Sequence, residues 1–296
     1  MSRPSSHGVP SWHGVTVATA LPFRDDLTVD LDRYGEHVRW LVASGCDGVV
    51  PNGSLGEYQT LTLAERDAVV TTAVEAGASV VAGVSAYGAG EARRHAEHAA
   101  EAGAGSVLLL PPNAYRADAA TVVQHYREVA KAGLPVVAYN NPFDTRVDLT
   151  PELLGELHRE GLIVAVKEFS GDVRRAYQIA EAAPGLDLLI GADDVLVELA
   201  IAGAKGWISG FTNALPVECV ALYRAAVAGD LATALPLYRL LHPLLRWDSR
   251  YEFVQAIKYT MDLVGRYGGP CRPPRGPVTT EQAAQLRAAL DAVRAR

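Results

Sequence analysis

The chain has 296 residues, of which 49% are hydrophobic and 21% are charged, and its formal net charge is −7. This composition excludes a disordered chain, and the acidic balance argues against nucleic-acid or anionic-membrane partners, which would favour a basic patch. No apolar run approaches the roughly 18 residues of a membrane span, and we expect no secretory signal. Three scattered cysteines do not suit a disulfide framework, so a cytoplasmic setting is expected.

From Val15 onward, short apolar or β-branched runs alternate with longer segments of helical period. The runs predict eight strands at residues 15–18, 48–50, 79–82, 106–110, 135–139, 163–167, 186–190 and 206–209. The segments between them have apolar residues at three- and four-residue steps and predict amphipathic helices, for example at residues 31–44, 63–76, 91–102 and 121–131. Glycines that follow these segments suit left-handed helix ends: Gly45, Gly77, Gly103, Gly133, Gly161 and Gly185.

Eight strand–helix units with short connections predict an α/β protein with a parallel sheet closed into a (β/α)8 TIM barrel. We expect residues 1–14 to form a flexible N-terminal arm and residues 15–211 to form the barrel. Residues 212–296 contain four further helical segments, at 217–228, 231–245, 251–263 and 280–295, and no linker precedes them. They predict a helical C-terminal region packed on the barrel.

Lys167 is the most informative of only four lysines, because it follows four apolar residues on the predicted sixth strand. The active site of such a barrel lies at the carboxyl ends of the strands, and strand alternation points Lys167 into the barrel mouth. Desolvation there favours the neutral amine, which attacks a ketone carbon. The alternative is a buried ion pair with Glu57 or Asp193 at the same rim.

Two nearby groups favour the reactive lysine over the ion pair. Tyr139 shares the inward phase of the fifth strand, so its phenol can lie close to Lys167 and relay protons, although a barrel-lining aromatic is the simpler interpretation. Residues 53–56 offer backbone N–H groups and one hydroxyl as a cradle for a carboxylate, a weak signal by itself.

Asp193 or Asp194, after the seventh strand, is typical of a helix N-cap.

Four motifs in barrel order resemble the dihydrodipicolinate synthase and N-acetylneuraminate lyase superfamily. Residues 53–57, Gly-Ser-Leu-Gly-Glu, look like its G-[ST]-x-G-E signature, and residues 139–142, Tyr-Asn-Asn-Pro, look like its Y-N-x-P. Val-Lys-Glu at 166–168 and Gly-Trp-Ile-Ser at 206–209 resemble its [IV]-K-[ED] and G-x-I-S segments. The resemblance extends over nearly the whole chain.

The resemblance implies a class I aldolase or lyase in which Lys167 forms an imine with pyruvate or another 2-oxo acid and Tyr139 handles the protons. Gly53, Ser54, Leu55 and Ile208 would then bind the substrate. The covalent imine replaces a cofactor, so no cofactor and no metal are expected. Members of this superfamily are commonly tetramers built from dimers, which implies that this chain forms a homo-oligomer, either a dimer or a tetramer.

Departures from the synthase pattern favour another lyase over dihydrodipicolinate synthase itself. Leu55 stands where the synthase usually has a threonine of a proton relay, and Asn113 stands where its relay tyrosine is expected, with Tyr115 nearby. Asp144 replaces the arginine that grips the second substrate, and Arg146 lies in an unmatched position. Four of these residues are therefore candidate contacts for a second substrate: Asn113, Tyr115, Asp144 and Arg146.

Several activities remain open from the sequence. The imine suits aldol cleavage or condensation, for example of a 4-hydroxy-2-oxo acid, and the alternatives are 4-hydroxy-tetrahydrodipicolinate synthase or a dehydratase or deaminase that uses the same imine. A pyridoxal-phosphate barrel enzyme and a barrel that binds a metabolite without turnover are rival classes.

Overall fold

A computed structural model of the chain describes residues 9–295. Eight parallel strands form its centre: β1 (Gly14–Ala18), β2 (Gly48–Val50), β3 (Val81–Gly83), β4 (Ser106–Leu109), β5 (Val136–Asn140), β6 (Ala165–Glu168), β7 (Asp187–Ile190) and β8 (Gly206–Ser209). The order in the sheet is β2-β1-β8-β7-β6-β5-β4-β3, and a parallel bridge between Val49 and Val80 brings its two edges together. This arrangement confirms the predicted (β/α)8 barrel.

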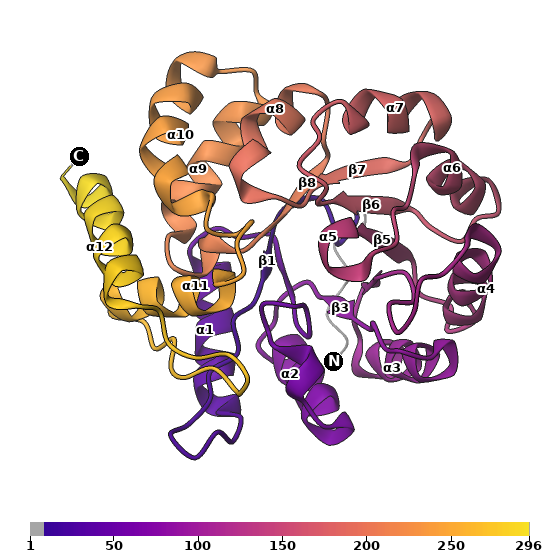
Figure 1. Ribbon diagram of the computed structural model, residues 1–296, viewed down its shortest axis with the longest axis horizontal. Helices are drawn as coiled ribbons and strands as arrows, with labels where there is room; N and C mark the ends of the chain where they lie inside the picture. Colours follow the sequence, from indigo (N-terminus) through magenta and orange to yellow (C-terminus); the bar gives the residue numbers. More distant parts are fainter. Residues whose placement is uncertain (1–8, 296) are drawn as a thin grey trace.

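Helices follow the strands and surround the barrel (Figure 1). They are α1 (Leu31–Ala43), α2 (Leu63–Glu75), α3 (Ala89–Ala102), α4 (Ala119–Ala130), α5 (Pro142–Thr145), α6 (Pro151–Arg159), α7 (Arg175–Ala182) and α8 (Leu196–Ile201). Three 3-10 turns lie in the loops at the strand ends: η1 (Tyr58–Thr60), η2 (Asp193–Val195) and η3 (Phe211–Asn213). Gly103, which ends α3 at φ +94°, is one of the six predicted glycines, all of which have positive φ.

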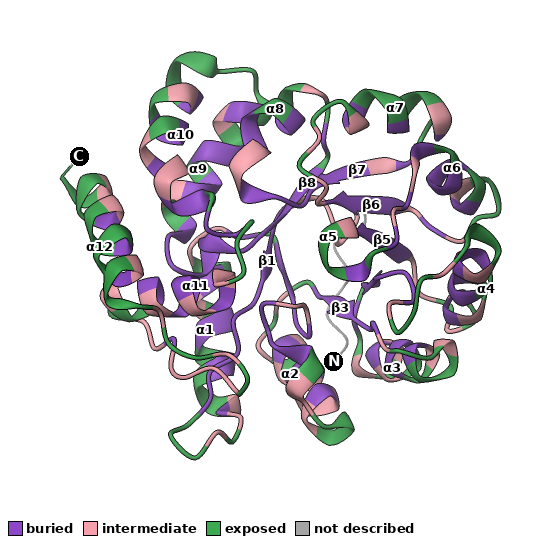
Figure 2. Cartoon of the chain, viewed as in Figure 1, coloured by how far each residue is buried: buried purple, intermediate pink, exposed green. Residues whose placement is uncertain are grey.

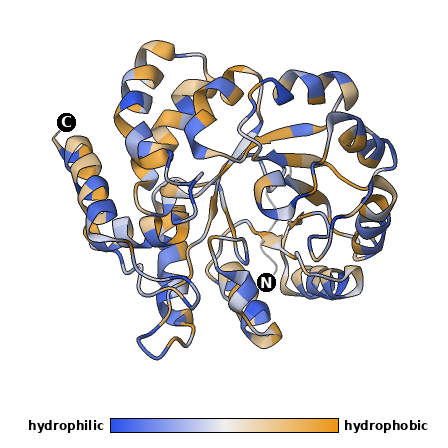
Figure 3. Cartoon of the chain, viewed as in Figure 1, coloured by the Kyte–Doolittle hydropathy of each residue, from blue (hydrophilic) through white to orange (hydrophobic). Residues whose placement is uncertain are grey.

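The strands are almost entirely buried, whereas the helices bury one face and expose the other (Figure 2). Hydropathy follows the same division, with apolar residues along the strands and polar residues on the outer helix surfaces (Figure 3). The strands are apolar on both faces because one face lines the barrel interior and the other packs against the helices. No helix in residues 9–295 is long and apolar enough to cross a membrane.

The C-terminal helices are α9 (Pro216–Val227), α10 (Leu231–Leu245), α11 (Phe253–Leu263) and α12 (Thr280–Arg294). Helix α9 packs on α8, and α12 packs on α10 and α11, so the four helices gather on one side of the barrel (Figure 1). The segment between α10 and α11 reaches the carboxyl ends of the strands, where it lines a cavity. The C-terminal region therefore contributes to the barrel mouth.

Part of the predicted N-terminal arm, residues 1–8, lies outside the described residues. The hydroxyl of Ser11 lies 2.8 Å from the hydroxyl of Ser106, which is the first residue of β4. Trp12 donates a hydrogen bond from Nε1 to Asp187 at 2.9 Å, and Nε2 of His13 lies 2.7 Å from the same carboxylate. Residues 11–13 thus contact the amino ends of β4 and β7, opposite the barrel mouth.

Candidate active site

A cavity of about 1210 Å³ occupies the carboxyl ends of the strands. Loops after β2, β4, β5 and β6 line it, together with the segment between α10 and α11 and with Arg275 from the loop before α12. Barrel enzymes place their active sites at this end of the strands. The cavity is therefore the candidate active site.

Lys167 points into this cavity from the end of β6. Its register partner on β5 is Tyr139, and only 6% of Lys167 is exposed. The ammonium nitrogen lies 4.3 Å from the centre of the Tyr139 ring and 5.5 Å from that of Phe169. Aromatic faces attract a cation weakly compared with a carboxylate, so the charged form of Lys167 has little compensation for its burial.

Burial lowers the pKa of the Lys167 ammonium, and the carboxylates of Asp248 and Asp193 oppose this effect. Within residues 9–295, no carboxylate oxygen lies within the 4.0 Å ion-pair distance of Lys167 Nζ. A lowered pKa increases the fraction of neutral amine at physiological pH, and the neutral amine is the nucleophilic form. The environment of Lys167 therefore suits attack on a carbonyl carbon.

The two carboxylates of the ion-pair alternative have other partners. Glu57 Oε1 lies 2.8 Å from the ammonium nitrogen of Lys258, and both residues are almost completely buried. Asp193 accepts hydrogen bonds from Nε1 of Trp207 and from the backbone N–H of Phe211, both at 2.9 Å. The ion pair of Lys167 with Glu57 is therefore not formed. The prediction that Asp193 or Asp194 caps the helix that follows is wrong, because no side chain caps η2 or α8. Asp193 instead accepts from the backbone N–H groups of Gly210 and Phe211, at the start of η3.

Tyr139 lies beside Lys167 with 6% of its surface exposed. Burial raises the pKa of its phenol well above the ordinary value, and the charges of Asp248 and Asp144 add to the effect. The amide of Asn141 donates a weak hydrogen bond to the phenol oxygen at 3.4 Å. The phenol therefore stays protonated and suits donation of a proton to a nearby oxygen.

The loop after β2 contributes three predicted binding residues to the cavity lining: Gly53, Ser54 and Leu55. Ser54 is half-buried, whereas Leu55 is only 3% exposed and adds an apolar wall. The loop then turns at Glu57, which adopts a left-handed conformation with φ +53°. Ser54 is thus the polar side chain that this loop presents to a ligand.

The predicted second-substrate contacts divide into two groups. Asn113, Asp144 and Arg146 line the cavity, and Tyr58 lines it with them. Tyr115 is 64% exposed and does not line the cavity. Ile208, predicted to bind the substrate, is fully buried in β8 and is likewise absent from the lining.

Several residues that line the cavity are not among the site residues predicted from the sequence. Tyr58 lies two residues after the predicted cradle of residues 53–56, so its position next to this loop was a usable signal. Phe169 follows Lys167 by two residues and packs edge-on against Tyr139 with 6.2 Å between ring centres. Asp248 and Arg250 belong to the segment between α10 and α11, where no motif or spacing indicates a site.

No group of three or more His, Cys, Asp or Glu side chains in the described part of the chain is arranged to hold a metal ion. The polar groups of the cavity are instead one lysine, three phenols, serine hydroxyls, amides, carboxylates and arginines. This set suits acid–base and nucleophilic chemistry on an anionic carbonyl compound.

Comparison with known proteins identifies the family. The model of the dihydrodipicolinate synthetase family matches residues 11–293. The chain is 34% identical over 283 residues to a 4-hydroxy-tetrahydrodipicolinate synthase of Methanothrix thermoacetophila, covering 94% of this chain and 96% of that protein. It is 35% identical over 282 residues to an uncharacterised DapA-like lyase of Halobacterium salinarum, covering 94% and 93%.

The solved structures agree with the sequence relatives. The crystal structure of dihydrodipicolinate synthase from Aquifex aeolicus superposes with a TM-score of 0.91 at 28% identity, covering 96% of this chain and 98% of that one. The chain therefore belongs to the dihydrodipicolinate synthetase family, and it is a lyase of the aldolase type with a lysine Schiff-base mechanism.

Proposed function

We propose that Lys167 is the lysine that forms the Schiff base, and that the enzyme is a class I aldolase acting on pyruvate or a related 2-oxo acid. The observation that carries the proposal is the burial of Lys167 in the barrel-mouth cavity, beside Tyr139 and with no carboxylate of residues 9–295 at ion-pair distance. The neutral amine attacks C2 of the 2-oxo acid and forms a carbinolamine. Tyr139 gives a proton to the departing hydroxyl, and loss of water leaves the imine.

The substrate carboxylate binds at the loop after β2, where Ser54 and the backbone N–H groups of residues 54–56 form the cradle. Removal of a C3 proton converts the iminium into an enamine, whose C3 attacks an aldehyde. The reverse reaction cleaves a 4-hydroxy-2-oxo acid. A cavity of about 1210 Å³ is far larger than pyruvate needs, which supports a second reactant of substantial size.

The second reactant lies toward the cavity rim, lined by Asn113, Asp144, Arg146 and Arg250. A second candidate function is 4-hydroxy-tetrahydrodipicolinate synthase, which is the name of a relative 34% identical to this chain. Leu55 and Asp144 support the first function, because they stand where the synthase pattern has its relay threonine and the arginine that grips the second substrate. A panel of 2-oxo acids assayed for pyruvate release, with aspartate semialdehyde plus pyruvate as the second arm, separates the two.

The imine is tested by adding borohydride to the enzyme with pyruvate, followed by intact-mass measurement and peptide mapping. We expect one adduct on Lys167, which Lys167→Ala abolishes. Lys131→Ala, a change at the exposed end of α4, is the matched control and keeps the adduct. No adduct in the wild-type enzyme, or an adduct on another lysine, contradicts the proposal.

We also propose a cytoplasmic enzyme, supported by the three free cysteines. Its assembly as a homodimer or homotetramer is a further proposal, which sedimentation at micromolar concentration tests.

A further inference from the structure

Asp248 is a buried carboxyl group at the barrel mouth that the Schiff-base scheme above does not use. It lies between α10 and α11, lines the cavity with Lys167 and is 8% exposed. A Cβ atom built on Gly210, just after β8, would lie 2.4 Å from Oδ1 of Asp248. The glycine thus lets the carboxyl group pack directly against the barrel backbone at the end of β8.

Asp248 and Asp193 are two neighbouring carboxyl groups with different surroundings. Asp193 is fully buried and is held by Trp207, by the backbone N–H groups of Gly210 and Phe211, and by a longer contact of 3.4 Å with Ser209. No side chain among residues 9–295 donates a hydrogen bond to Asp248, although the backbone N–H of Asp193 approaches it. The Asp193 carboxylate is therefore occupied by hydrogen bonds from the end of β8 and the loop that follows it. Asp248, by contrast, lines the cavity and is available to a ligand there.

Titratable groups from three elements surround Asp248. Burial raises the pKa of Asp248 well above its ordinary value, the charge of Asp193 raises it further, Lys167 lowers it and Asp194 raises it. Asp193 and Asp194 belong to η2, Lys167 belongs to β6, and the charge of Asp248 in turn raises the pKa of Tyr139 on β5. Because the charge of Lys167 lowers the pKa of Asp248, the acid form of Asp248 is favoured most while Lys167 is neutral.

We propose that Asp248 is a catalytic residue that exchanges a proton with the oxygen on C4 of the substrate. The inference rests on the proposed function, because it concerns the step that follows imine formation. In condensation, the electron pair of the Lys167 enamine forms the C3–C4 bond, the aldehyde C=O π bond breaks, and its oxygen takes the proton of Asp248. In cleavage, the Asp248 carboxylate takes the C4 hydroxyl proton, and the electron pair of the O–H bond forms the aldehyde C=O bond. The C3–C4 bond breaks, and its electron pair converts the Lys167 iminium into the enamine.

Charge balance supports this assignment. The enamine and the acid form of Asp248 are both neutral, and the step converts them into a cationic iminium and an anionic carboxylate. The two charges arise together in a buried site, where each stabilises the other more strongly than in water. The iminium also lowers the pKa of Asp248, so the carboxyl group releases its proton as the C–C bond forms. Tyr139 approaches Lys167 from β5, whereas Asp248 lies over β8, which leaves Tyr139 for imine formation.

The test compares wild type, Asp248→Asn and a control, Glu198→Gln, which changes an exposed carboxylate on α8 that does not line the cavity. Borohydride trapping with pyruvate and exchange of the pyruvate methyl protons in D2O, followed by NMR, report imine and enamine formation. Release of pyruvate reports C–C cleavage, with the fastest 4-hydroxy-2-oxo acid of the panel as the probe, starting from 4-hydroxy-2-oxoglutarate.

We expect Asp248→Asn to keep the Lys167 adduct and to exchange the methyl protons at a rate within about twofold of wild type. Its kcat for cleavage falls about 100-fold or more, the range of general acid–base catalysis, with KM within about threefold. In wild type the cleavage kcat falls as the pH drops, because protonation removes the base form of Asp248, and Asp248→Asn lacks this dependence. Glu198→Gln matches wild type in every measurement.

Retention of cleavage by Asp248→Asn within tenfold of wild type overturns the role of Asp248 and leaves the imine intact. Loss of the adduct in the variant alone also overturns it, because Asp248 then acts in imine formation. Absence of the adduct in wild type instead refutes the proposed function itself, so the two failures are distinguishable.

Discussion

Two lysines are buried in the described part of the chain, and their counter-charges distinguish them. Lys258 is 1% exposed, and its ammonium contacts Glu57 and the carbonyl oxygen of Pro270, each at 2.8 Å. Lys167 is 6% exposed and has aromatic rings where Lys258 has a carboxylate. Lys258 is therefore a structural residue held by its ion pair, whereas incomplete compensation favours the neutral amine of Lys167.

Lys258→Met leaves the carboxylate of Glu57 buried without its cation. Because an unpaired buried charge is costly, we expect the free energy of unfolding to fall by about 3–5 kcal/mol in urea denaturation. The double variant Glu57→Gln with Lys258→Met recovers most of this loss, because neither charge remains. Lys131→Met, at an exposed position, changes stability by less than about 0.5 kcal/mol. Equal stability of Lys258→Met and wild type would show that the pair is not coupled.

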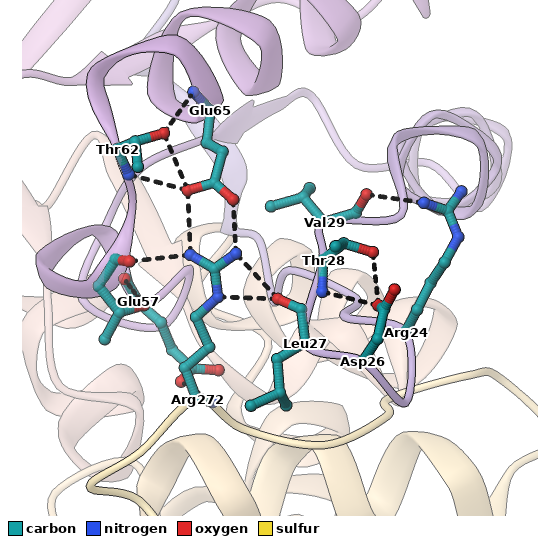
Figure 4. A network of polar contacts seen from close by, with 10 residues as sticks. Arg24, Asp26, Leu27, Thr28, Val29, Glu57, Thr62, Glu65 and Arg272 are labelled. Atoms are coloured by element: carbon teal, nitrogen blue, oxygen red, sulfur yellow. Dashed lines mark hydrogen bonds and ion pairs between the residues drawn. The ribbon is translucent and has the colours of Figure 1, made fainter.

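At the scale of elements, Arg272 connects three segments that are distant in the sequence (Figure 4). Its guanidinium lies in the loop between α11 and α12 and donates to both carboxylate oxygens of Glu65 in the first turn of α2. It also donates to the carbonyl oxygens of Leu27, before α1, and of Thr60 in η1. Its backbone N–H donates to Glu57, so the loop is attached beside the buried ion pair.

The pair of Arg272 and Glu65 predicts a stability change at low pH. The hydrogen bond from Arg272 lowers the pKa of Glu65 from 4.5 to about 2. Because the pKa is depressed in the folded state, the stabilisation is complete above pH 4.5 and is lost as the pH falls toward 2.

We expect Arg272→Met to lower the free energy of unfolding by about 2 kcal/mol at pH 7, with the difference from wild type shrinking between pH 4.5 and pH 2. Denaturant titrations across this range measure it. Arg127→Met removes the more exposed pair with Glu160 and is expected to cost less than about 1 kcal/mol. A constant difference at all pH values would contradict the assignment to Glu65.

At the scale of the whole molecule, the barrel closes between β2 and β3, where the pairing is sparse. The Val49–Val80 bridge and a hydrogen bond from Gly83 N–H to the carbonyl oxygen of Pro51, at 2.9 Å, hold this junction. A Cβ atom on Gly83 would lie 2.3 Å from the carbonyl oxygen of Asn52. The junction therefore requires a residue without a side chain, and it leads directly into the Gly53–Ser54 loop of the cavity.

Gly83→Ala forces this backbone contact apart, and we expect a loss of at least about 2 kcal/mol of stability by thermal or urea unfolding. The displaced loop is also expected to raise the KM for the 2-oxo acid. Gly90→Ala is the matched control, because Gly90 lies in α3, a Cβ atom added to it would have no atom within 4 Å, and alanine favours a helix. Similar stabilities for the two variants would argue against tight closure at this junction.

The sequence by itself determined the eight strands, the helices between them and the inward phase of Lys167 and Tyr139, because these features depend on local periodicity and on the alternation of side chains along a strand. Asp248, by contrast, carries no local pattern, since its role depends on the segment after α10 folding over β8.

The ion pair of Glu57 with Lys258 likewise joins residues separated by 201 positions. Because Glu57 is paired with Lys258, it is not the ion-pair partner of Lys167. Only the tertiary structure decided which buried charges are paired, because burial and the distance to a counter-charge arise from packing between segments that the sequence does not place side by side.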